Sequence, residues 1–184
     1  MIVLVGASAS GKTEIAKILY QKFGYHKCIT TTTRPKRTHE KDGIDYHFVS
    51  VDQFMSIQDQ AGFAESASYH DHFYGIQKKD VKRDGVVIVE PNGANTLIKT
   101  LTRDVFVVYV HASEALREKR MIERGDLQSV VKERIVFDRQ VFDEKKIMRI
   151  DLIIENETES INHIAQFIDQ SYQLYISTQP VKGD

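Results

Sequence analysis

The sequence predicts an α/β fold, in which a parallel β-sheet lies between layers of helices. Ile2–Val5 is a short, continuously apolar run, which is typical of a strand buried inside a parallel sheet. Apolar residues then recur at helical spacing from Lys12 to Phe23, and Gly24 supplies a stop. The same alternation of apolar strand and helix returns after residue 85. These three observations predict a doubly wound sheet.

Short apolar runs place three further strands, at Val86–Val89, Val105–Val110 and Leu152–Ile154. Helical spacing predicts helices from Gly93 to Leu101 and from Ser113 to Arg124. A last helix follows the final strand, because the apolar residues there fall on a single stripe. That stripe consists of Ile161, Ile164, Phe167, Ile168 and Tyr172.

The alternation is interrupted between about residues 30 and 82. Short strands are predicted there at Tyr46–Val49 and Phe63–Tyr69, with a helical stretch from Val51 to Gln60 between them. This pattern predicts an inserted subdomain of mixed α and β structure.

A second interruption covers about residues 117–149, which are densely charged with both signs. Gly125 predicts a turn between two helices, and an ordinary solvated helical hairpin would have the same composition. No linker is long enough to separate halves that fold independently. We therefore expect one domain, 1–184, whose core is formed by about residues 1–29, 83–116 and 150–184.

Composition restricts the class of protein. The chain has 184 residues and a formal net charge of -1, so it carries no overall basic field that would hold nucleic acid. The single cysteine, Cys28, cannot form an internal disulfide, which favours a reducing compartment. No apolar run approaches the ~20 residues that a membrane helix needs. We expect a cytoplasmic protein with no membrane or nucleic-acid partner, either a monomer or a homodimer.

A phosphate-binding loop follows the first strand and opens the first helix. Its pattern is G-x-x-x-x-G-K-[ST], whose backbone amides surround phosphates while the lysine reaches the β- and γ-phosphates. The threonine hydroxyl is expected to bind Mg²⁺, and ATP is the expected ligand. These features predict a P-loop NTPase fold. The eight residues are Gly6, Ala7, Ser8, Ala9, Ser10, Gly11, Lys12 and Thr13.

Hydroxyl and guanidinium groups gather in Thr30–Arg37, directly after Cys28 and Ile29, which we expect to lie in a strand. Arg34 and Arg37 are three residues apart and could hold one phosphate group from two directions. A solvated basic loop would look the same, so this run alone leaves both interpretations open.

Further motifs occur in an order that resembles the guanylate kinase family over nearly the whole chain. Thr32-Thr33-Arg34-Pro35-Lys36-Arg37, Glu40 and Gly43-Ile44-Asp45-Tyr46-His47-Phe48-Val49 are similar to the family signature T-T-R-P-x-R, E and G-x-D-Y-x-F-V. Phe63-Ala64-Glu65 and His72-Phe73-Tyr74-Gly75 are similar to its F-x-E and N-Y-Y-G elements. Gly93-Ala94, Glu123-Arg124-Gly125, Arg134, Arg139 and Asn156 follow in the family order.

The resemblance implies that residues 30–82 bind GMP. Arg34, Arg37, Tyr46 and Tyr74 would surround its phosphate, with Glu40 ordering the two arginines, and Gly75 belongs to the same motif. Glu65 would accept hydrogen bonds from the guanine N1–H and 2-amino groups, and Thr30 would also face the base.

In the predicted lid, the resemblance implies that Arg134 and Arg139 close over the ATP phosphates. With Lys12 and Arg34 they form the expected catalytic set. Arg124 and Asn156 would contact ATP, although Arg120 and Arg124 would equally suit a face of helical salt bridges. Glu90 would hold a water on Mg²⁺ or cap the next helix.

Two residues depart from the family pattern on the base-recognition side. Ile76 stands where Ser or Thr is usual, and Ile88 stands where the first acid of a D/E-x-D segment is usual. The expected function is ATP-dependent phosphorylation of GMP, and of dGMP. One alternative is a kinase of the same fold with another phosphorylated acceptor, such as ribose 1,5-bisphosphate. The other is a module that binds protein without catalysis, although its phosphate loop would be expected to have decayed.

Overall fold

The computed structural model describes residues 1–38, 40–69 and 71–179, so His39, His70 and the last five residues of the predicted core lie outside it. Five parallel strands form the central sheet, in the order β2-β7-β1-β8-β9. Their bounds are β1 Ile2–Val5, β2 His26–Lys27, β7 Gly85–Ile88, β8 Phe106–His111 and β9 Leu152–Glu155. The predicted parallel sheet is confirmed.

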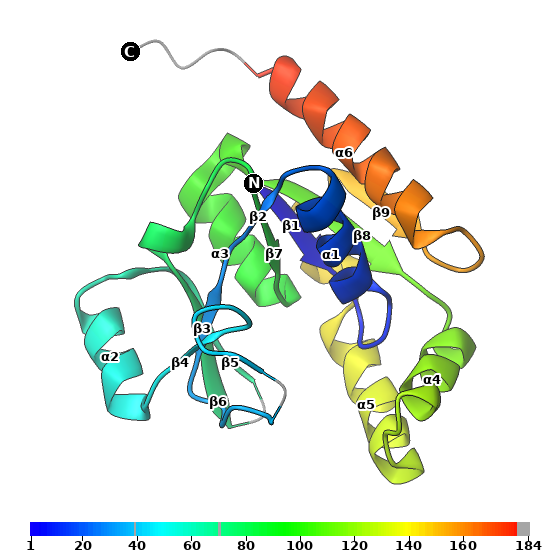
Figure 1. Cartoon of the computed structure of the whole chain (residues 1–184), viewed down its shortest axis with the longest axis horizontal. Coiled ribbons are helices and arrows are strands. Elements are labelled where there is room, and N and C mark those ends of the chain that lie inside the picture. Colours follow the sequence, from blue (N-terminus) through cyan, green and yellow to red (C-terminus); the bar gives the residue numbers. More distant parts are fainter. Residues whose placement is uncertain (39, 70, 180–184) are drawn as a thin grey trace.

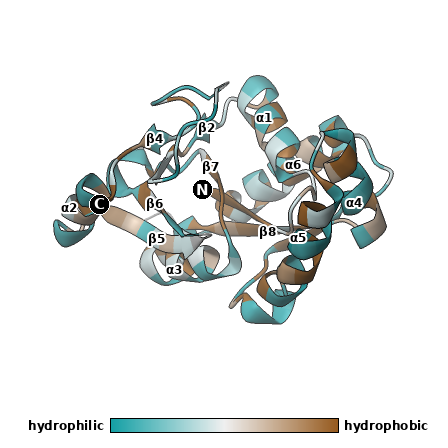
Figure 2. Ribbon diagram, turned by 90° about the horizontal axis from the view of Figure 1, so that it is seen from below, coloured by the Kyte–Doolittle hydropathy of each residue, from teal (hydrophilic) through white to brown (hydrophobic). Residues whose placement is uncertain are grey.

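Each side of the sheet has its own layer of helices and its own core (Figure 1). Because strand side chains alternate between faces, Ile2 and Leu4 pack under two helices while Val3 and Val5 pack under a third. The first layer contains α1 Lys12–Lys22 and α6 Ile161–Ser177, and the second contains α3 Pro91–Leu101. Figure 2 shows β7 and β8 as hydrophobic ribbons within this arrangement. The three central strands, β7, β1 and β8, are therefore buried on both faces.

A second, four-stranded sheet has the order β4-β3-β6-β5 and lies on one side of the central sheet (Figure 1). Helix α2, Val51–Asp59, packs against it through the buried Phe54, whose ring stacks on Phe63 with centroids 4.4 Å apart. Ser50 caps this helix and exchanges hydrogen bonds with Gln53. The strands are β3 Thr30–Thr32, β4 His47–Phe48, β5 Phe63–Tyr69 and β6 His72–Gln77.

The two residues before the threonine run differ from expectation. The sequence placed a strand at Cys28 and Ile29, but the structure has β2 before them and β3 after them. Cys28 lies where the chain leaves the central sheet and enters the second one, and its side chain is buried in the core. The chain crosses from one sheet to the other at Cys28 and Ile29, so these two residues form a connection instead of the predicted strand.

Two antiparallel helices, α4 Glu114–Glu123 and α5 Gln128–Val141, project from the other side of the sheet (Figure 1). They pack through the buried Met121, Val131 and Ile135. Short 3₁₀ helices also occur at Lys78–Asp80, Thr102–Asp104 and Glu144–Lys146. None of the helices in the described part of the chain is both long and apolar enough to cross a membrane.

Candidate active site

Residues 6–11 of the phosphate loop connect the end of β1 to the start of α1. Gly11 has φ +102°, a conformation that side chains with a Cβ rarely adopt. A Cβ at this position would also lie 2.1 Å from Nδ2 of Asn156, which instead donates to the carbonyl of Ser10 at 2.7 Å. The loop therefore fits closely against the segment after β9.

Lys12 points back along this loop. Its Nζ donates to the carbonyls of Gly6 and Ala7 at 2.6 and 2.7 Å. Burial lowers the pKa of Lys12 to about 8, while the charge of Asp138 acts in the opposite direction. An anion placed beside this ammonium would favour its protonated form.

A cavity of about 390 Å³ opens beside the start of α1. The first amides of a helix have no acceptor within the helix, and the helix dipole adds positive potential there, so this end suits phosphate. Arg120 donates to the carbonyls of Ala9 and Asn156, both at 3.2 Å. The cavity is lined by Ala9, Gly11, Lys12, Thr13, Glu14, Arg120, Arg124, Asn156 and Ile161.

A second cavity, of about 270 Å³, lies between the phosphate loop and the four-stranded sheet. Lys12 lines both cavities, so a group bound in one would lie close to a group bound in the other. The second cavity is lined by Ser8, Lys12, Thr30, Tyr46, Glu65, Ala67, Tyr74, Ile88, Val89, Glu90 and Phe142.

Glu65 is the most unusual group in the second cavity. It is 5% exposed, and no donor among the described residues binds its carboxylate. Burial, and then the neighbouring charge of Glu90, raise the pKa of Glu65 to about 7. Burial also raises the pKa of Glu90 to about 7, and the negative charge of Asp138 adds a smaller contribution in the same direction. A ligand with two adjacent N–H donors would satisfy the Glu65 carboxylate.

The predicted phosphate-binding arginines are held by Glu40. Its two carboxylate oxygens accept from Nη2 of Arg34 at 2.7 Å and from the backbone amide of Arg37 at 2.8 Å. Burial opposes ionisation here, but these hydrogen bonds lower the pKa of Glu40. The guanidinium of Arg34 also lies 5.3 Å from the ring centroid of Tyr46. Glu40 therefore fixes the arginine loop next to one wall of the second cavity.

Lid arginines meet at Asp126, on the turn between α4 and α5. Nε of Arg124 lies 2.9 Å and Nη1 of Arg134 lies 3.2 Å from its Oδ2. The hydrogen bond from Arg124 is the main reason that the pKa of Asp126 is lowered, and the charge of Arg37 contributes from the second subdomain. The turn between α4 and α5 is therefore close enough to the inserted subdomain for Asp126 and Arg37 to interact electrostatically.

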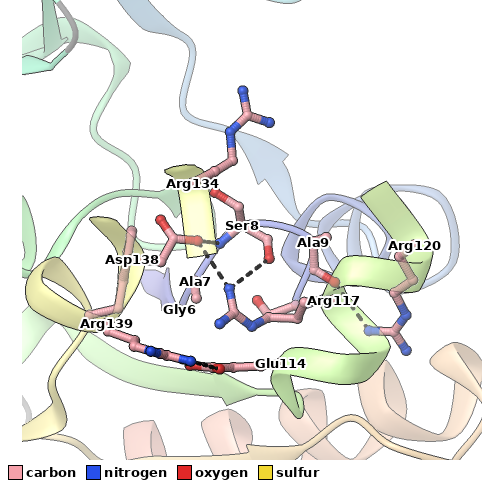
Figure 3. A network of polar contacts seen from close by, with 12 residues as sticks. Gly6, Ala7, Ser8, Ala9, Glu114, Arg117, Arg120, Arg134, Asp138 and Arg139 are labelled. Carbon is pink, nitrogen blue, oxygen red and sulfur yellow. Dashed lines mark hydrogen bonds and ion pairs between the residues drawn. The ribbon is translucent and has the colours of Figure 1, made fainter. Parts of the chain in front are cut away.

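Arg134 and Arg139, which are predicted to close over the ATP phosphates, line neither of the two cavities described above. Arg134 instead pairs with Asp126, and Nε and Nη2 of Arg139 donate to Glu114 at 2.6 and 2.5 Å (Figure 3). The predicted contact of Arg139 with ATP requires a different rotamer or a movement of α5.

The two departures from the family pattern have different positions. Ile76 is fully buried in the core beneath α3, paired across the sheet with Thr30 and Glu65, and does not line the cavity. Ile88 does line it, as an apolar wall. Gly75 does not line the cavity, and a Cβ at this position would be 2.8 Å from the Phe63 ring.

Three residues near the loop were not singled out by the sequence analysis. Phe142 lines the second cavity, with Nζ of Lys12 5.8 Å from its ring centroid. Arg117 and Asp138 form a buried ion pair against the loop. The spacing of Asp138 from Arg134, one helical turn apart, was the available signal that both belong to one face of α5.

The two residues expected to serve Mg²⁺ line different cavities. Thr13 lines the first cavity and Glu90, at the carboxyl end of β7, lines the second. Hydroxyl and carboxylate oxygens are the donors that Mg²⁺ prefers, so these residues fit the ion. Glu90 also stands at the N-cap of α3 but makes no side-chain capping bond there.

A family model and known sequences similar to this chain point to one family. The family model described as guanylate kinase matches residues 1–171. Guanylate kinases of Thermotoga maritima and Nitratidesulfovibrio vulgaris are 33% and 35% identical to the chain, and each match covers 68% of the chain and 64% of the relative's length. The guanylate kinase of Syntrophus aciditrophicus is 29% identical over 91% of both chains.

A comparison with solved structures concerns the fold. The crystal structure of guanylate kinase from Anaplasma phagocytophilum superposes with a TM-score of 0.67 at 19% identity, over 98% of this chain and 87% of that one. At this level of identity the likeness concerns the fold.

Proposed function

The chain belongs to the guanylate kinase family, and we propose that it catalyses the ATP-dependent phosphorylation of GMP, and of dGMP, to the corresponding diphosphate. The observation that carries this proposal is the position of Lys12, which lines both cavities. One cavity adjoins a phosphate loop and the other contains a buried carboxylate without a donor. Phosphoryl transfer depends mainly on aligning donor and acceptor and on neutralising charge, and this arrangement does both.

In the proposed reaction, ATP binds the phosphate loop, residues 6–13, with Arg124 and Asn156 beside it. A phosphate oxygen of GMP attacks the γ-phosphorus, and the bond from this phosphorus to the β–γ bridging oxygen breaks, releasing ADP. The acceptor phosphate is already ionised, so the chain supplies no general base. Lys12 and the lid residues Arg134 and Arg139 stabilise charge on the transferring group.

Two groups of residues hold GMP in this proposal, one at its phosphate and one at its base. Tyr46, Tyr74, Thr30 and Glu65 line the second cavity, whereas Arg34 and Arg37 do not. Arg34, Arg37, Tyr46 and Tyr74 bind the GMP phosphate, and the contacts of Glu40 fix the arginines for this task. Glu65 accepts from the adjacent N1–H and 2-amino donors of guanine, with Thr30 facing the same base. Adenine lacks this pair of donors, so its binding would leave the Glu65 carboxylate unsatisfied.

Mg²⁺ is the proposed cofactor, with Thr13 as a ligand and Glu90 acting through water. The ion would neutralise the charge that develops on the phosphates during transfer. We also propose a cytoplasmic monomer or homodimer, supported by the single cysteine, Cys28, and the near-neutral net charge of -1. The same charge supports the proposal that nucleic acid and membranes are not partners.

A specific observation supports one alternative acceptor. Ile88 presents an apolar wall to the second cavity where the family usually has an acid. The polar contact that this acid would make is missing, which is compatible with an acceptor that has no base, such as ribose 1,5-bisphosphate. The buried Glu65 disfavours this alternative, because a sugar phosphate has no paired N–H donors. A protein-binding module without catalysis is disfavoured by the intact Gly11-Lys12-Thr13 sequence.

The test is an ADP-release assay with MgATP and each of GMP, dGMP, AMP, CMP, UMP and ribose 1,5-bisphosphate. We expect turnover with GMP and dGMP, loss of turnover in Lys12→Ala, and no loss in Lys17→Ala, an exposed lysine of the same helix. Turnover of ribose 1,5-bisphosphate without turnover of GMP would establish the alternative acceptor. ATP binding without turnover of any acceptor would contradict the proposal.

A further inference from the structure

A buried ion pair connects both lid helices to the phosphate loop (Figure 3). Nη1 of Arg117, on α4, lies 3.0 Å from Oδ2 of Asp138, on α5. The two side chains are only 5% and 0% exposed. The same carboxylate oxygen accepts from the backbone amide of Ser8 at 2.8 Å, and Nη1 of Arg117 also donates to the Ser8 carbonyl at 3.4 Å. The ion pair therefore binds both the backbone amide and the backbone carbonyl of Ser8.

Each carbonyl from Gly6 to Ser10 accepts a hydrogen bond from a side chain. Lys12 binds the first two, Arg117 binds that of Ser8, Arg120 binds that of Ala9, and Asn156 binds that of Ser10. Fixing the carbonyls fixes the orientation of the peptide units, and hence the direction in which the amides point. Three of these donors come from outside the loop and its helix, so tertiary contacts determine the shape of the loop.

We propose that Arg117 and Asp138 are positioning residues, which hold the Ser8 peptide so that the phosphate loop is already in its ATP-binding shape before ATP arrives. This inference rests on the ATP site of the proposed function and does not depend on which acceptor is used. The pair carries no net charge, so it orients the loop without adding repulsion next to the phosphates.

Stability alone is a poor explanation for this pair. Taking two charges out of water costs about as much as their attraction returns, and apolar side chains of similar volume are often as stable in the same place. Oδ1 of Asp138 is moreover buried with no hydrogen-bond partner within the described residues, although buried polar atoms are usually paired. The buried ion pair is therefore unfavourable for the free energy of folding. Its hydrogen bonds to Ser8 supply a functional reason for it.

The test separates positioning from stability with a double variant, Arg117→Met with Asp138→Val, which replaces the pair by apolar side chains. We expect this variant to keep its thermal midpoint while its KM for MgATP rises about tenfold, the loss of one hydrogen bond to a charged group. Its KM for GMP should change less than about twofold. The control is Lys119→Met with Glu123→Ala, which removes an exposed ion pair of α4 and should leave both KM values unchanged.

A measurement on the unaltered protein keeps the test independent of variant folding and of turnover. The Ser8 amide should exchange with solvent slowly in nucleotide-free protein, because Asp138 holds it in a buried contact. Fast exchange of this amide, or a double variant that binds MgATP as tightly as the unaltered protein, would overturn the inference. Slow exchange together with weakened MgATP binding in the absence of any acceptor would support it, even if the chain failed to phosphorylate GMP.

Discussion

Glu65→Gln should make the ligand-free protein more stable while impairing its proposed activity. The folded chain raises the pKa of Glu65 from 4.5 to about 7, chiefly by burial. One pKa unit corresponds to about 1.4 kcal/mol, so the ionised side chain costs the folded state about 3 kcal/mol. Because Glu65 is 5% exposed, solvent screening reduces this cost little.

The sign follows from proton binding. Between pH 4.5 and about 7 the folded state holds the Glu65 proton that the unfolded chain has released, so the free energy of unfolding falls as pH rises through this range. Glutamine does not titrate and escapes this loss. The stability of the variant relative to the unaltered protein should therefore increase by about 3 kcal/mol between about pH 5 and about pH 8. Comparing the two proteins at each pH cancels the contribution of groups that do not interact with Glu65, such as Glu40.

Urea unfolding at several pH values measures this difference. Glu133→Gln, an exposed substitution on α5, is the control and should follow the unaltered protein across the range. In the same preparations the KM of Glu65→Gln for GMP should rise at least about tenfold, because the guanine donors lose a charged acceptor. A stability difference that stays constant with pH would refute the reasoning, since it would mean that Glu65 is not buried as an ionisable group.

Other predictions follow from the same contacts. Gly93→Ala should raise the KM for GMP several-fold with little effect on that for MgATP, because the new Cβ would lie 2.7 Å from Oε1 of Glu65; unchanged kinetics would contradict the close approach. MgATP binding should take up protons above about pH 8, since phosphates raise the lowered pKa of Lys12, and calorimetry in buffers of different ionisation enthalpy would detect this. A Glu40→Gln variant should raise the KM for GMP by about tenfold, because Arg34 loses its charged partner; equal effects on both substrates would indicate a general loss of structure.

Much of the fold could be predicted from local patterns. Strands such as Ile2–Val5 are buried on both faces, so each is a continuous apolar run that the sequence displays directly. The strand β6 was not singled out, because His72–Gln77 mixes polar, aromatic and glycine residues and is defined by its pairing with β3 and β5. Short strands of this kind depend on their neighbours more than on their own residues.

The sequence by itself located the phosphate loop, because Gly6–Thr13 is contiguous and matches the motif at fixed spacing. It also predicted which residue types serve the proposed acceptor. Only the tertiary structure decided that Ile76 lies in the core while Ile88 lines the cavity, and that Asp138 contacts Ser8 across 130 positions of the chain. The physical reason is that burial and long-range hydrogen bonds arise from packing between elements, and no local periodicity records which elements meet.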